Sequence, residues 1–143
     1  MSELRTTAAL ASALRPVVFR LSRRLRQMRS SDHNLGQGHL QAMGALFRDG
    51  PMLIGELASR EKVRPPSMTR IVDVLEDAGM AVRRISENDR RQCVVSLTEA
   101  GHALVLADRQ RRDAWLAQRI AELTPAEREV LRQAIPILEK VNH

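Results

Sequence analysis

The sequence is poor in aromatic side chains, which make up only 2% of its 143 residues. There is no tyrosine, and the aromatic residues are Phe19, Phe47 and Trp115. Proteins that bind single-stranded nucleic acid stack bases on such rings, so this class of function is disfavoured. The single cysteine, Cys93, excludes a disulfide framework and favours a reducing compartment, so we expect a cytoplasmic protein.

Long hydrophobic runs are also absent. No apolar stretch approaches the roughly 18 residues that a membrane-spanning helix needs, so we expect no membrane partner. The first residues carry an early acid and Pro16 and lack a cleavage-like end, which is not the pattern of a signal peptide. Glycine-rich phosphate loops, nucleophile elbows and convincing acid–base pairs are missing as well. We therefore expect neither an enzyme nor a bound cofactor.

Positive charge is what the sequence has in excess. Lysine and arginine number 23 against 17 acids, which gives a net charge of +6, and only Lys62 and Lys140 are lysine. Seven bases and one acid within residues 1–30 account for the whole excess. The arginine-rich surface that these residues form is either exposed to solvent or borders phosphate or an acidic partner. Arginine suits phosphate and guanine edges, although a GC-rich genome also favours it.

The spacing of apolar residues predicts one largely helical domain. Residues 4–29 and 35–48 form two helices joined by a polar loop at 30–34. A long helix follows at 99–121, and the Thr124–Glu127 capping box starts the last one. The centre of the long helix, 108–113, is entirely polar. Such a helix bridges two packed parts rather than filling a core.

Residues 54–77 have the pattern of a helix-turn-helix. A short helix at 54–61 and a tight connection at 62–64 precede a second helix, which Pro65-Pro66 opens and Gly79 follows as a left-handed cap. Two strands, 80–85 and 92–97, come next, with a turn-rich charged hairpin between them. The predicted fold is therefore mainly α with a small β wing, a winged helix-turn-helix between terminal helices.

Side chains near the start of the second helix that point away from its apolar stripe are candidates for reading DNA. Ser67 and Thr69 can donate to phosphates or bases, and Arg70 can make a two-pronged contact with guanine. The helix N-terminus adds main-chain N–H groups toward phosphate. The predicted contacts on this helix are Arg64, Pro66, Ser67, Thr69 and Arg70.

The hairpin supplies a second set of candidates. An arginine at its tip suits the negative potential of a narrow minor groove. Asp89 stands two positions before Arg91, where its carboxylate either fixes the direction of the guanidinium or serves as an ordinary turn residue. The predicted wing contacts are Arg83, Arg84, Asp89, Arg90 and Arg91.

The stretch 54–101 resembles the MarR family of bacterial winged-helix regulators, and a similar helix order extends the resemblance over roughly residues 10–143. The motifs that carry it are Thr69-Arg70 followed by Leu75-Glu76-Asp77-Ala78-Gly79, Arg83 four residues after that glycine, Asp89-Arg90-Arg91, and Leu97-Thr98.

The resemblance implies a sequence-specific regulator of transcription that binds double-stranded DNA. It implies a single domain over 1–143, with a DNA-binding lobe at about 35–97 and dimerisation helices at about 4–34 and 98–143. It further implies a homodimer on a pseudo-palindromic operator, with Arg91 in the minor groove. A repressor that a small-molecule effector releases is the expected form of regulation.

Other residues leave alternatives open. The winged helix could serve protein contacts instead, with the basic first helix binding an acidic partner. Cys93 indicates strand packing or, alternatively, redox sensing. Trp115 indicates a helix contact or the wall of a ligand pocket. A metal-responsive regulator is a further alternative, although the sequence predicts no metal site; its candidate ligands are Asp32, His33, His39 and His102.

Overall fold

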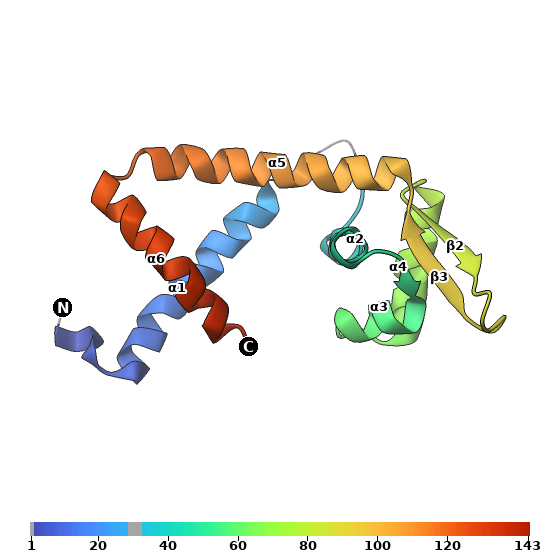
Figure 1. Ribbon diagram of the computed structural model, residues 1–143, viewed down its shortest axis with the longest axis horizontal. Coiled ribbons are helices and arrows are strands. Elements are labelled where there is room, and N and C mark those ends of the chain that lie inside the picture. Colours follow the sequence, from blue (N-terminus) through green and yellow to red (C-terminus); the bar gives the residue numbers. More distant parts are fainter. Residues whose placement is uncertain (1, 29–32) are drawn as a thin grey trace. The chain divides into compact units, whose positions relative to one another are not determined.

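The computed structural model describes residues 2–28 and 33–143 (Figure 1). It is mostly helical and has a small antiparallel sheet, so the predicted fold class is confirmed. In chain order the elements are η1 (Ser2–Arg5), α1 (Thr7–Gln27), α2 (Gln37–Asp49), β1 (Met52–Leu53), α3 (Ile54–Arg60), α4 (Pro65–Asp77), β2 (Ala81–Ile85), β3 (Cys93–Leu97), α5 (Glu99–Ala121) and α6 (Pro125–Val141).

The chain divides into two compact units. We call Ser30–Arg109 the central lobe, and Met1–Arg29 with Gln110–His143 the terminal unit. Helix α5 runs through both, and the boundary falls inside its polar centre at 108–113. The prediction that this helix bridges two packed parts is thus confirmed. On the lobe side of the boundary the polar Asp108 is nevertheless buried, with 2% of its surface exposed.

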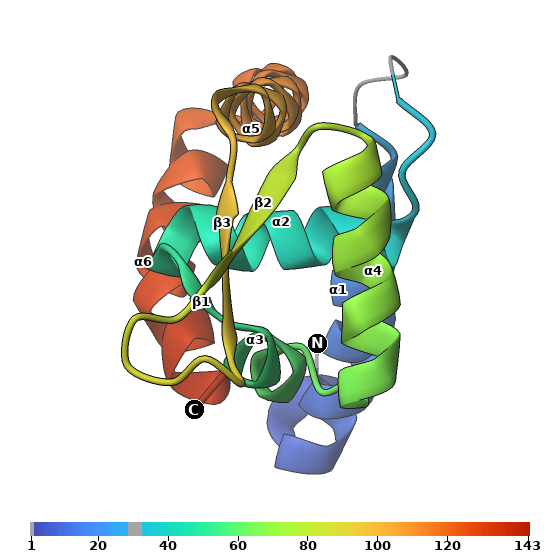
Figure 2. The ribbon, with the colours of Figure 1, turned by 90° about the vertical axis from the view of Figure 1, so that its right-hand side faces the viewer.

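The core of the central lobe lies between α2, α3, α4 and the sheet (Figure 2). Helix α4 buries Met68, Val72 and Leu75, which recur at helical spacing as the sequence predicts. They meet Leu46 of α2 and Leu57 of α3 in one cluster. Each such side chain stabilises the fold by about 1.5–3 kcal/mol through burial. This packing holds α4 rigidly in the lobe.

The three strands lie in the order β1-β3-β2, and each neighbouring pair is antiparallel. Val95 of β3 pairs with Met52 on one side and Arg83 on the other. Val95 is fully buried, and its alternation with the half-buried Val94 and Ser96 fits a sheet with one face on the core. The β2–β3 hairpin, including residues 86–92, is the wing.

The end of α4 is fastened to the start of α5. Gly79 has φ +77°, the left-handed cap that the sequence predicts. The Thr98 hydroxyl accepts the N–H of Gly101, which caps α5. Gly101 packs so closely that a Cβ there would lie 2.1 Å from the Met80 carbonyl oxygen. These contacts join the lobe end of α5 to α4, the helix that the sequence predicts to read DNA and that we call the recognition helix.

Helices α1 and α6 of the terminal unit bury none of their residues. Their large apolar side chains are exposed instead: Leu10, Leu14, Val17, Val18, Phe19 and Leu21 on α1, and Val130, Leu131, Ile135, Ile137, Leu138 and Val141 on α6. Exposed apolar side chains in such number on two helices indicate an interaction surface. Among the described residues, no helix is long and apolar enough to cross a membrane.

Some predicted boundaries are wrong. The sequence predicts one helix over 4–29, but a 3₁₀ turn ends at Arg5 and α1 begins at Thr7. The reason is Thr6, whose Oγ1 accepts the Ala9 N–H over 3.1 Å and caps the helix. Helix α2 starts at Gln37 rather than 35, with Gly36 as its predicted N-cap. Most of the predicted loop at 30–34 lies outside the described residues.

Candidate nucleic-acid interface

The helix-turn-helix is present as predicted, with α3 and α4 joined by a tight turn. Two main-chain bonds close this turn, from Glu61 N–H to Leu57 O and from Val63 N–H to Ala58 O, each over 3.0 Å. Lys62 between them has φ +54°, a left-handed conformation that is uncommon for a residue other than glycine. The turn thereby sets the angle at which α4 leaves α3.

Two prolines limit the main-chain N–H donors that the start of α4 can direct toward an anion. Arg64 is its N-cap, and its extended backbone (φ −70°, ψ 143°) is what a residue before proline prefers. Pro65 and Pro66 have no N–H, so Ser67 supplies the one free main-chain donor among the first three helix positions. At these positions the predicted main-chain contribution toward phosphate therefore comes from Ser67, and side chains supply the other predicted contacts.

The predicted side chains on α4 fall into two groups. Arg64, Pro66, Ser67 and Arg70 are exposed. Thr69 is half-buried, and its hydroxyl donates to the Pro65 carbonyl oxygen over 3.0 Å. In this structure the proton is therefore engaged within α4, and donation by Thr69 to DNA stays a prediction. Its oxygen remains available as an acceptor, which leaves Ser67 and Arg70 as the helix's free side-chain donors.

Arg83 is not free, although the sequence places it with the DNA contacts. Its Nη2 lies 2.6 Å from Asp73 Oδ1, and its Nε bonds to Glu76 Oε1. Partial burial lowers the pKa of the guanidinium, but the bonds to Glu76 and Asp73 outweigh it and raise the pKa above its usual value. Both carboxylates belong to α4, so Arg83 ties β2 to the recognition helix. Neither partner is evident from the spacing of residues in the sequence.

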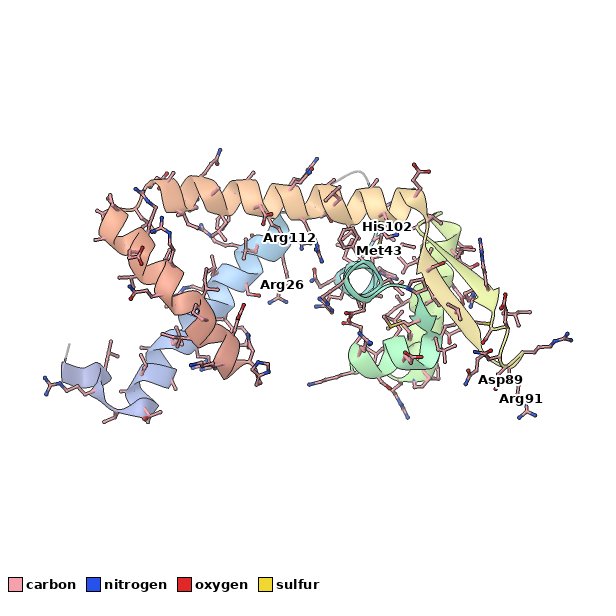
Figure 3. The ribbon with its side chains drawn as sticks, in the orientation of Figure 1. Arg26, Met43, Asp89, Arg91, His102 and Arg112 are labelled. Atoms are coloured by element: carbon pink, nitrogen blue, oxygen red, sulfur yellow. The ribbon has the colours of Figure 1, made fainter. Side chains whose placement is uncertain are left out.

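The tip of the wing carries the remaining candidates. Arg84, Asp89, Arg90 and Arg91 are all exposed. The carboxylate of Asp89 accepts the main-chain N–H of Arg91 over 3.0 Å and does not hold its guanidinium. Of the two roles considered for Asp89, the structure thus shows the turn residue. Figure 3 shows both residues at the end of the hairpin, with the Arg91 side chain extending away from the lobe.

The amino end of the recognition helix and the tip of the wing lie at the same end of the central lobe. In Figures 1 and 2 the amino end of α4 and the hairpin loop both lie away from the lobe end of α5. Glu87 and Asp89 accompany Arg90 and Arg91 in that loop, so the tip has no net charge. Attraction to DNA must therefore come from where individual guanidiniums lie, rather than from the charge of the loop as a whole.

The described residues give little support to a metal site or to redox sensing by Cys93. Within residues 2–28 and 33–143, no three His, Cys, Asp or Glu side chains could hold a metal ion together. The Nδ1 atoms of His33 and His39 accept the N–H groups of Leu35 and Gly36, each over 3.2 Å. Cys93 is half-buried in β3, less enclosed than the sequence suggests. The predicted metal candidate Asp32 lies outside the described residues.

A second feature is a pocket of about 360 Å³ in the terminal unit, which is open to solvent. Trp115 of α5 forms one wall, and guanidinium carbons of Arg24 and Arg119 lie 6.0 and 5.3 Å from its ring centre. The side chain thus makes helix contacts and also borders a pocket, the two roles that the sequence left open. The cavity is lined by Gln27, Met28, Arg111, Ala114, Trp115 and Gln118.

Known proteins match most of the chain. A sequence model of the MarR family matches residues 37–93. An HTH-type transcriptional regulator of Mycobacterium tuberculosis is 44% identical over 135 residues, which cover 94% of both chains. The HTH-type transcriptional repressor MdtR of Bacillus subtilis is 30% identical over 95 residues, 66% of this chain and 60% of that one. A solved transcriptional regulator of Pseudomonas aeruginosa is 32% identical, covers 94% of each chain and has a TM-score of 0.81.

Proposed function

The chain belongs to the MarR family of transcriptional regulators, and we propose that it is a repressor that binds a pseudo-palindromic operator as a homodimer. Regulators of this family bind DNA and are not enzymes. The observation that carries the proposal is the shared exposure of the α4 amino end and the wing arginines at one end of the central lobe. A helix fits the major groove while a flanking hairpin reaches the adjacent minor groove.

In this proposal the recognition helix and the wing make different contacts with DNA. Arg70 lies exposed on α4, where it reads a base edge through two parallel N–H bonds to guanine. Ser67 and Arg64 contact the phosphates beside it, and Thr69 serves as an acceptor. Arg91 enters the minor groove, whose negative potential attracts it, while Arg84 and Arg90 lie along the backbone.

The homodimer is supported by the terminal helices. Single apolar residues on a surface need no explanation, but α1 and α6 together expose twelve large ones. Burying them against a second copy returns about 25 cal/mol for each Å² of apolar area. A homodimer has two-fold symmetry, and its DNA site has matching half-sites. We propose the division of the single domain 1–143 into an operator-binding lobe at about 35–97 and dimerisation helices at about 4–34 and 98–143.

The repressor role and the effector rest on separate observations. The relative MdtR is named a repressor, which favours that sign of regulation over activation. The cavity beside Trp115 has the size range of small-molecule sites and combines apolar walls with a few polar groups. We place the effector there, and its binding lowers the affinity for the operator.

The test of the proposal is selection of bound DNA from a random pool by the wild-type protein. We expect a two-fold symmetric site whose half-sites are centred about one helical turn, roughly 10 base pairs, apart or a multiple of it. A gel shift on the chain's own promoter, with a salt series, then gives affinity. Failure to enrich any sequence would instead favour the protein-interaction module, and an enriched single half-site would contradict the dimer.

A further inference from the structure

We propose that Arg83 is a positioning residue that fixes the angle of the wing to the recognition helix and makes no DNA contact itself. The proposal rests on the DNA-binding function above. Arg83 sits in β2, opposite Val95 of β3, while both of its partners, Asp73 and Glu76, sit on α4. It therefore links the two elements that reach DNA.

The geometry of the link suits positioning. Asp73 and Glu76 are three residues apart, so they share one face of α4, and Arg83 meets them with different nitrogens, Nη2 and Nε. A planar guanidinium held by two carboxylates at once has little freedom to turn. The side chains of Arg83 and Glu76 are each 31% exposed and that of Asp73 is 49% exposed, so water screens the bond to Glu76 less than the bond to Asp73. The pair of bonds thus resists both sliding and twisting of β2 on α4.

The charges argue against a direct phosphate contact. Two carboxylates already neutralise the charge of Arg83, and the net charge of the three side chains together is negative. A phosphate oxygen approaching this guanidinium would have to displace Asp73 or Glu76 and would meet the freed carboxylate. Arg84, the next residue along β2, is exposed, and among the described residues its side chain makes no hydrogen bond or ion pair. It is the matched control, because it has the same side chain in the same strand without the link.

The position of the wing decides whether its tip reaches the minor groove. Residues 86–92 extend beyond the paired part of the hairpin, so a small rotation of β2 moves Arg91 by a larger distance at the tip. A displacement on the order of 1 Å is enough to lose a directed guanidinium contact. Removing Arg83 should consequently remove the contribution of Arg91.

The experiment is a double-mutant cycle on the DNA that the wild-type protein selects. Dissociation constants are measured over a salt series for Arg83→Ala, Arg91→Ala, the double variant, and the same set built on Arg84→Ala. We expect Arg91→Ala to weaken binding about tenfold in the wild-type and Arg84→Ala backgrounds, but less than about threefold with Arg83→Ala. Arg84→Ala should lower the salt slope by about one, which marks a phosphate contact.

A second variant keeps Arg83 and removes its partners, Asp73→Ala with Glu76→Ala. Positioning predicts that Arg91→Ala again has a reduced effect in this background. A direct phosphate contact by Arg83 predicts an undiminished Arg91 effect, which would overturn the proposal. Tighter binding overall is expected in either case, because two negative charges are lost. Wild-type-like binding by Arg83→Ala would also overturn the proposal. Circular dichroism melts establish that each variant folds, and if Arg83→Ala does not, the double alanine variant at Asp73 and Glu76 decides. A wild-type protein that selects no DNA counts against the proposed function alone.

Discussion

The hydroxyl of Thr98 donates a hydrogen bond to the main-chain carbonyl of Gly79 over 2.6 Å. Thr98 also donates its N–H to the Met80 carbonyl oxygen over 3.0 Å. The residue just before α5 is therefore bonded to the second and third residues after the end of α4. These two bonds join the start of α5 to the segment that follows α4.

Replacing Gly101 should test how tight that junction is. A Cβ at this position would lie 2.1 Å from the Met80 carbonyl oxygen, so Gly101→Ala forces main chain apart. We expect a loss of about 1–3 kcal/mol in the free energy of unfolding, measured by thermal or urea denaturation. Gly44→Ala in α2 is the control, because a Cβ there meets nothing within 4 Å. It should stabilise the helix by about 0.5–1 kcal/mol, and equal destabilisation by both changes would contradict the steric argument.

Arg70 and Arg91 should differ in the kind of binding they lose. Arg70→Ala should cost about 1–3 kcal/mol and relax the base preference at one position in each half-site. Arg91→Ala should reduce the affinity for matched and scrambled sites more evenly and should lower the salt dependence of binding by about one unit of slope. The loss of affinity should be largest at sites flanked by A·T tracts. Binding isotherms on both kinds of site measure this. Equal loss of sequence preference from the two changes would contradict the division of tasks.

Asp89→Ala should act on the wing turn. The carboxylate accepts only the Arg91 N–H, so its loss removes one exposed hydrogen bond and loosens the tip. We expect a fall in stability of at most about 1 kcal/mol and a DNA defect milder than that of Arg91→Ala. Asp89→Asn keeps an oxygen that can accept the same bond and should resemble the wild type. Melting curves together with binding constants distinguish the outcomes, and a severe defect in Asp89→Asn would point to a role for the charge itself.

The dimer should depend on the apolar face of α1. Leu14→Glu places a charge among the exposed apolar residues that the second copy is proposed to cover. Light scattering at micromolar concentration should show a dimer for the wild type and a monomer or a weakened dimer for this variant. Arg15→Glu, the next residue and on another face of the helix, should leave the dimer intact. Melting of the wild type should also depend on concentration, and a wild-type monomer would end the dimer proposal.

The start of α6 should lose stability in acid. The Thr124 N–H donates to the Glu127 carboxylate, and this bond, with a contribution from the Thr124 hydroxyl, holds the pKa of that carboxyl below its usual value. Because the folded pKa is the lower one, the stabilisation is complete above the unfolded pKa and is lost as the pH falls through the folded value. Glu127→Gln should therefore show a flatter fall of melting temperature with acid than the wild type. Thr124→Ser keeps the hydroxyl and should follow the wild-type curve; a flat curve there would contradict this cause.

Local sequence predicted the elements because each carries its own signals. Pro65 at the first position of α4, Gly79 after its end and the capping box at Thr124 act within a few residues of themselves, and the structure has all three. The apolar stripe of α4 likewise predicted which side would face the core. The exposed positions of Arg70 and Arg91 follow from the same periodicity and turn chemistry.

Tertiary structure decided what those exposed side chains are free to do. Nothing in the spacing of Arg83 shows that Asp73 and Glu76 of another element will neutralise it, because a strand and a helix meet only after the chain folds. The burial of Asp108 and the tight packing at Gly101, where a Cβ would lie 2.1 Å from the Met80 carbonyl oxygen, likewise depend on packing between distant segments. Sequence alone therefore determined the helices, the wing and the direction of their faces, whereas contacts between elements determined which arginines remain free to meet DNA.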